Sequence, residues 1–227
     1  MAGFDLPRRL VAEALGTAML VATVVGSGIM AASLTQDVGL ALLGNTLATG
    51  AILVVLITIL GPISGAQFNP AVSLVFALSR RLPKRDFGGY ILAQIVGGVA
   101  GTIAAHLMFA LPLVEMSTKV RTGGAQWFSE GVATFGLVAV ILASVKFEQK
   151  AVPWLVGLYI TAAYWFTAST SFANPAVALA RSLTNTFSGI RPVDLPGFWL
   201  AEIAGAVAAL ILCTWLLRPS SARTVRA

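Results

Sequence analysis

The chain has 227 residues, of which 57% are hydrophobic and only 11% are charged. Its mean hydropathy is +0.87, which excludes an ordinary soluble globular domain and favours a protein that lies in lipid. The formal net charge is +6, but the basic residues lie in short loops between apolar runs, so we expect them to orient the protein in a membrane and not to bind nucleic acid.

Six apolar segments are long enough to cross a bilayer, and we expect one membrane domain over residues 1–227. In chain order they are residues 10–30, 39–60, 87–111, 126–145, 152–168 and 198–217. An even number of spans places both termini on the same side. That side would hold Arg8, Arg9, Arg80, Arg81, Lys84, Arg85, Lys146, Lys150, Arg218, Arg223 and Arg226, and the other side only Lys119, Arg121, Arg181 and Arg191. The positive-inside rule therefore predicts cytoplasmic termini.

The segments repeat within the chain. The first span contains AEALGT at 12–17 and the fourth contains SEGVAT at 129–134, while AQIVGG at 93–98 in the third matches AEIAGA at 201–206 in the sixth. Two shorter apolar stretches both begin with Asn-Pro-Ala. The sequence thus divides into halves of about 8–111 and 126–218, and three spans per half require inverted topology, in which paired broken helices meet near the bilayer midplane.

Small residues recur at a spacing of four in the third and sixth spans. They are Gly97 with Gly101, and Gly205 with Ala209. Such pairs allow helices to approach closely, so they indicate either a contact between these two spans across the pseudo-twofold axis or ordinary helix packing.

The two Asn-Pro-Ala motifs predict helix starts. They comprise Asn69, Pro70 and Ala71, and Asn174, Pro175 and Ala176. Proline suits the first helical position and asparagine the N-cap. We expect the preceding segments, 63–68 and 169–173, to be extended and to expose carbonyl groups, which is tolerated at membrane depth only beside a watery cavity. The positive ends of the two half-helices would then meet, with both asparagine amides facing the lumen.

Two such motifs at equivalent places of a six-span repeat resemble the aquaporin or major intrinsic protein family over nearly the whole chain, most closely at ISGAQFNPAV, residues 63–72. The resemblance implies an all-α membrane protein with six transmembrane helices plus two half-helices. It also implies a homotetrameric passive channel in a bacterial inner membrane, without cofactor, metal or enzymatic chemistry. Gln67 stands where the family often has histidine, so no pH response through that imidazole is expected.

The resemblance also identifies four positions of a selectivity filter. The second motif continues with Val177, where the family usually has arginine, and counting from the motif asparagines gives Thr49, Ala162 and Ser171 for the other positions. All four side chains are small or neutral, which predicts a wide, uncharged filter. Such a filter would be less selective for water and would favour larger uncharged solutes, namely glycerol, other polyols or urea-like amides. By analogy with metalloid-permeable bacterial relatives, it would also favour undissociated arsenous acid.

Several polar residues remain in or near the spans. In the family, glutamates at the positions of Glu13 and Glu130 accept hydrogen bonds from the pore loops, and a proton relay is the alternative. Arg181 lies one turn beyond Val177, where it either lines the outer vestibule or, as we favour, snorkels or bonds loop carbonyls. We interpret His106 as structural and Cys213 as a packed thiol.

Other functional classes stay open at this point. An ion-coupled secondary transporter also uses inverted repeats, but it should carry further charged residues inside the membrane. A structural or junctional membrane protein with little transport is a second alternative. An enzyme is disfavoured because one histidine, one cysteine and no acid pair near the motifs leave no general acid-base constellation.

Overall fold

The computed structural model describes residues 3–219, so Arg223, Arg226 and the outermost ends of the predicted domain lie outside the described residues. The described part is built from α-helices and contains no strand. They are α1 (Leu6–Leu34), α2 (Val38–Ser64), α3 (Pro70–Leu78), α4 (Lys84–Met108), α5 (Gly124–Phe147), α6 (Val152–Phe166), α7 (Pro175–Arg181) and α8 (Leu195–Leu216), with 3-10 turns at Gln149–Ala151 and Pro192–Asp194. The predicted all-α fold is confirmed.

Six of these helices coincide with the six predicted spans. Helices α1, α2, α4, α5 and α8 are long and apolar enough to cross a membrane. Helix α6 has only 15 residues, which at ~1.5 Å per residue is about 22 Å. It carries Pro153 in its first turn and ends at Phe166, after which the backbone of Thr167 is extended. The fifth span is therefore shorter than the others.

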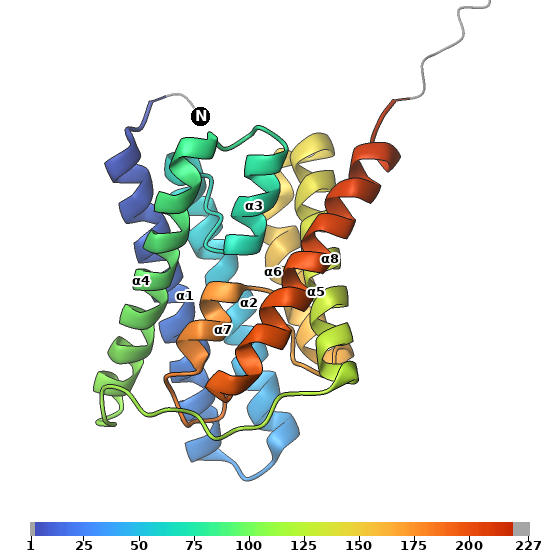
Figure 1. Cartoon of the computed structure of the whole chain (residues 1–227). Coiled ribbons are helices and arrows are strands. Elements are labelled where there is room, and N and C mark those ends of the chain that lie inside the picture. Colours follow the sequence, from blue (N-terminus) through green and yellow to red (C-terminus); the bar gives the residue numbers. More distant parts are fainter. Residues whose placement is uncertain (1–2, 220–227) are drawn as a thin grey trace, which may run out of the picture.

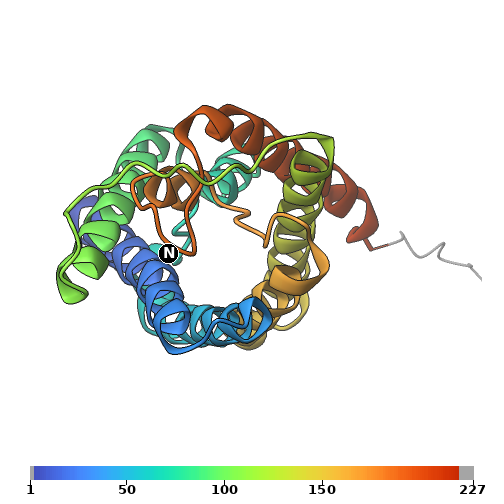
Figure 2. The same cartoon turned by 90° about the horizontal axis from the view of Figure 1, so that it is seen from below.

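The elements follow the same order in both halves, namely two helices, a half-helix of 9 residues (α3) or 7 residues (α7), and a further long helix. Within the halves α1 packs on α2 and α4, and α5 packs on α6 and α8, while α2 and α6 join the halves to each other. Figure 1 shows α3 and α7 among the long helices, pointing to opposite ends of the molecule. The N-terminal end of α1 and the C-terminal end of α8 lie at the same end. Seen from below, along the axes of the long helices, the helices form a ring (Figure 2).

Gly97 of α4 and Gly205 of α8 each pack against a helix of their own half. A Cβ on Gly97 would lie 2.2 Å from the Ala14 carbonyl oxygen of α1, and one on Gly205 would lie 2.2 Å from the Gly131 carbonyl oxygen of α5. The close approach is thus within each half. Of the two alternatives, ordinary helix packing therefore holds for these glycines, and α3 and α7, which each contact both α4 and α8, lie between those two helices.

Candidate functional site: a central pore with two half-helices

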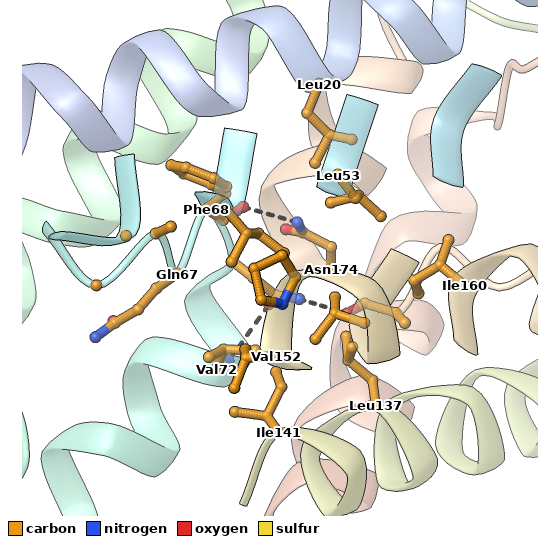
Figure 3. Close-up of a pocket in the computed structure, with 18 of the residues that line it drawn as sticks. Leu20, Leu53, Gln67, Phe68, Val72, Leu137, Ile141, Val152, Ile160 and Asn174 are labelled. Carbon is orange, nitrogen blue, oxygen red and sulfur yellow. Dashed lines mark hydrogen bonds between the residues drawn. The ribbon is translucent and has the colours of Figure 1, made fainter. Parts of the chain in front are cut away.

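A cavity of about 780 Å³ occupies the centre of the helix ring. Its lining extends from Arg81 and Lys150, near the end that carries the termini, to Arg181 near the other end. Figure 3 shows that most side chains around its middle are aliphatic. The labelled aliphatic residues are Leu20, Leu53, Val72, Leu137, Ile141, Val152 and Ile160. Polar groups enter this wall at only a few places, chiefly from the two segments that precede α3 and α7.

Asn69 and Asn174 are equivalent members of this lining. Each begins a half-helix: the Asn69 side-chain oxygen accepts from Ala71 N at 2.9 Å, and that of Asn174 accepts from Ala176 N at 3.1 Å. Each amide nitrogen has two N–H groups. One of them bonds a carbonyl oxygen of the opposite segment, at 2.7 Å for Asn69 and 2.8 Å for Asn174. Among the described residues the other N–H has no recorded acceptor, so it is available to the cavity.

The segments before the motifs are not uniformly extended, because residues at equivalent places in both have positive φ. Ala66 and Ser171, three residues before each asparagine, have φ of 48° and 49°. Phe68 and Ala173, one residue before each asparagine, have φ of 49° and 48°. Left-handed conformations at residues other than glycine cost on the order of 1–3 kcal/mol each. Their occurrence at equivalent places in both halves therefore requires strong local partners.

Buried carboxylates provide partners for this backbone. Glu13 accepts from Ser64 Oγ at 2.6 Å, from Gln67 N at 2.9 Å and from Phe68 N at 2.6 Å. It also accepts from the Gln94 amide at 2.9 Å. All four donors point at one side chain that is fully buried, so Glu13 anchors the first segment to α1.

The second segment is held in the same way, with one additional residue. Glu130 accepts from Phe172 N at 2.9 Å and from Ala173 N at 2.7 Å. Glu202 accepts from Asn174 N at 3.0 Å, a role that the sequence analysis above does not predict. The internal repeat carried the signal, because 201–206 matches 93–98 and so places Glu202 at the position of Gln94.

Three of the four predicted filter positions lie at the cavity, and one does not. Thr49, Ser171 and Val177 line it, whereas Ala162 is exposed and is absent from its lining. Tyr164 lines it instead and donates its hydroxyl to Thr49 Oγ1 at 3.4 Å. Residues two apart on a helix point to nearly opposite sides. The expected placement of Ala162 is therefore corrected to Tyr164, ten residues before Asn174 and not twelve.

Some polar atoms at the cavity are buried without a partner among the residues that the structure describes. They are the amide oxygen and nitrogen of Gln67, the hydroxyl of Ser171 and Nη1 of Arg181. A buried polar group left without a hydrogen bond costs about 1–3 kcal/mol. These atoms belong to residues of the cavity wall but are enclosed by neighbouring atoms, so they are distinct from the Asn69 and Asn174 donors.

The outer end of the molecule is closed over by the segment between α4 and α5. Ser117 N donates to Ser182 O at 3.0 Å, and Arg121 donates through Nε to Gly189 O at 2.9 Å. His106 is buried and bonds Thr184 Oγ1 at 2.7 Å, which agrees with a structural role. Cys213 is buried in α8 and makes no contribution to the cavity lining.

Comparison with known proteins gives relatives by sequence along most of the chain. Residues 2–164 match the family model described as Major intrinsic protein. The aquaglyceroporin AqpS of Rhizobium meliloti is 73% identical over 97% of this chain and 94% of its own length. Aquaporin Z of Brucella melitensis is 28% identical over 92% of this chain and 97% of its own length.

A solved structure supports the fold independently. The aquaglyceroporin from Plasmodium falciparum superimposes with a TM-score of 0.76 over 95% of this chain and 98% of that chain, at 21% identity. At this identity the match concerns the fold alone. The family model over residues 2–164 and the 73% identity over nearly the whole chain establish that this chain belongs to the major intrinsic protein family.

Proposed function

We propose that the protein is a passive transmembrane channel for small uncharged solutes, namely water, glycerol and similar polyols, and undissociated metalloid hydroxides such as arsenous acid. The observation that carries this proposal is the cavity of about 780 Å³ that both half-helices enter. The high identity to a protein named an aquaglyceroporin supports the same solute class.

The lining provides a physical route for such solutes. Aliphatic walls offer no hydrogen bonds, so a solute moves along them without binding tightly. Asn69 and Asn174 each direct an N–H toward the cavity from a half-helix start, and these donors match the oxygen atoms of water and hydroxyl groups. The positive ends of α3 and α7 meet there as well, and such half-helix dipoles disfavour protons and other cations in pores of this type.

The two carboxylates belong to the framework of this pore in our proposal. Glu13 and Glu130 fix the segments that carry the asparagines, and their hydrogen bonds to backbone N–H groups support that role. Neither carboxylate lines the cavity, and a group outside the lining is not placed to pass protons along the pore. We therefore assign both to loop support, not to a proton relay.

The membrane, the orientation and the oligomeric state that we propose for the channel rest on the distribution of basic residues and on the family. We propose a bacterial inner membrane with both termini in the cytoplasm, a homotetramer in lipid with one pore per subunit, and no enzymatic activity. The concentration of basic residues at the end that carries the termini supports the orientation. The many large apolar side chains exposed on the outer faces of α1, α2, α5 and α8 support lipid and subunit contacts.

Flux into proteoliposomes tests the proposal, with water, glycerol, urea and arsenous acid as the solutes. Leu53→Trp fills the cavity that Leu53 lines, and Leu200→Trp adds the same group at a residue of α8 that is 71% exposed. We expect rapid flux in the unmodified protein and in Leu200→Trp, and a strong reduction in Leu53→Trp. Equal flux in the two variants, or no flux above empty liposomes in the unmodified protein, would reject a channel through this cavity.

A further inference from the structure

Arg181 occupies the outer end of the cavity, at the last residue of α7. It is 2% exposed, yet it lines the cavity. Its guanidinium carbon lies 3.3 Å from the centroid of the Phe172 ring, and its Nε donates to the Ser188 carbonyl oxygen. The ring and the carbonyl fix the plane of the guanidinium, so its donors hold one direction instead of sampling many.

The guanidinium retains donors that the protein does not use. Nη1 is buried and has no hydrogen-bond partner in residues 3–219. Across the described ranges Arg181 also makes no salt bridge. An arginine that only tethers a loop would be expected to donate hydrogen bonds from its terminal nitrogens to carbonyl or carboxylate oxygens. Here Nε tethers the loop and Nη1 is enclosed by neighbouring atoms, while the residue as a whole lies in the cavity wall and brings its charge there.

Other cations lie close to Arg181 and raise the local positive potential. The Arg121 guanidinium carbon lies 5.0 Å from the same Phe172 ring, so the ring has an arginine against it from two elements. In the loop that covers this end, partial burial and then the charges of Arg121 and Arg181 lower the pKa of Lys119 to about 8. Asp194 at the same end of the molecule is already paired with Arg191. The outer mouth therefore carries several cations, whose charge the buried carboxylates Glu130 and Glu202 offset only in part.

We propose that Arg181 is a specificity-determining residue of this pore, which supplies a fixed positive charge one helical turn outward of Val177. Val177 replaces the arginine that the family usually has, and α7 carries a positive charge at Arg181 instead. Cations are repelled at the outer mouth, while neutral solutes pass a guanidinium whose plane is fixed by Phe172 and Ser188. This role rests on the channel function proposed above.

The opposing explanation is that Arg181 only holds the loop through Ser188 and Phe172. Arg181→Met keeps the length and packing of the side chain but removes charge and donors. Arg181→Lys keeps the charge but loses the planar fork. Lys119→Met is the matched control, because it removes one cation from the same end of the molecule at a residue that does not line the cavity.

The measurements are methylammonium, proton, glycerol and water flux in proteoliposomes, normalised to assembled protein. We expect no cation flux above empty liposomes in the unmodified protein and in Lys119→Met. Removing a unit charge from a partly desolvated site should raise cation flux by about tenfold or more in Arg181→Met. In Arg181→Lys cation exclusion should persist, and the ratio of glycerol to water flux should change by about twofold or more.

Three results would overturn the proposal. The first is cation flux through the unmodified protein, and the second is assembled Arg181→Met with no more cation flux than Lys119→Met. The third is Arg181→Lys that matches the unmodified protein in both cation flux and the ratio of glycerol to water flux. If neither Arg181 variant assembles, the residue is a structural tether. The glycerol arm separates this proposal from the channel function, because an unmodified protein that moves no neutral solute rejects the channel itself.

Discussion

Asn69 and Asn174 are tied to each other's pore segment, since the amide of each donates to the carbonyl oxygen of the residue that precedes the other, Ala173 and Phe68. The two half-helices are therefore coupled through side chains as well as by proximity. A change at one asparagine alters the backbone position of the opposite motif, and both motifs contribute to a single donor site.

Replacing either asparagine with aspartate should reduce glycerol and water flux by about tenfold. The carboxylate cannot donate to the opposite carbonyl, which loses its hydrogen bond, and two acceptor oxygens then face each other. Stopped-flow light scattering on proteoliposomes measures the loss. Asn185→Asp serves as the control, because Asn185 is exposed and its side-chain oxygen is already an acceptor for Thr118. Full flux in assembled Asn69→Asp would remove this residue from the donor site.

Glu13→Gln should lower stability more than it alters solute preference. Each oxygen of Glu13 faces donors only, so the new amide N–H₂ must oppose an N–H or O–H group. Each unsatisfied donor should cost about 1–3 kcal/mol, which thermal unfolding in detergent would register as a lower midpoint. Glu115→Gln, at an exposed loop residue, should leave the midpoint unchanged. A normal midpoint with altered solute preference would instead place Glu13 at the lumen.

Tyr164→Ala should widen the outer part of the pore, whereas Ala162→His should have no effect on it. Tyr164 lines the cavity and Ala162 does not, so a large ring introduced at Ala162 points away from the lumen. We expect the ratio of glycerol to water flux to rise in the first variant and to stay level in the second. The reverse pattern would restore Ala162 as the filter position.

Val177→Arg should suppress flux of glycerol-sized solutes while it spares water more. The new guanidinium projects into the lumen from α7 and lies one turn from Arg181, so the two cations repel each other and extend toward different levels of the pore. Partial loss is expected because Thr49 and Ser171 remain small. The ratio of glycerol to water flux measures the effect, and a ratio equal to that of the unmodified protein would show that selectivity is set elsewhere.

The sequence was sufficient for the six spans, the half-helices and their starts, because these depend on local features such as apolar length and Asn-Pro capping. It was insufficient where geometry depends on packing. Counting residues placed Ala162 at the filter, but the short α6 presents Tyr164 to the cavity. Spacing of small residues identified Gly97 and Gly205 as close contacts without identifying the partner helix.

The left-handed residues before each motif were not predictable, since alanine, phenylalanine and serine have no intrinsic preference for that conformation. Only the hydrogen bonds to Glu13 and Glu130 account for it, and those join residues far apart in the chain. The charge at Arg181 was visible in the sequence, but whether it faces the lumen or a loop carbonyl depends on Phe172 and Ser188.

The matched φ values of the two pore segments also bear on how such a channel can diversify. Ala66 and Phe68 in one half correspond to Ser171 and Ala173 in the other, so the same backbone path tolerates side chains of quite different size and polarity. The path is set by buried acceptors on neighbouring helices, outside the segments themselves. After an ancestral duplication, each half could therefore accumulate substitutions along its pore segment independently, and solute preference could drift without rebuilding the scaffold.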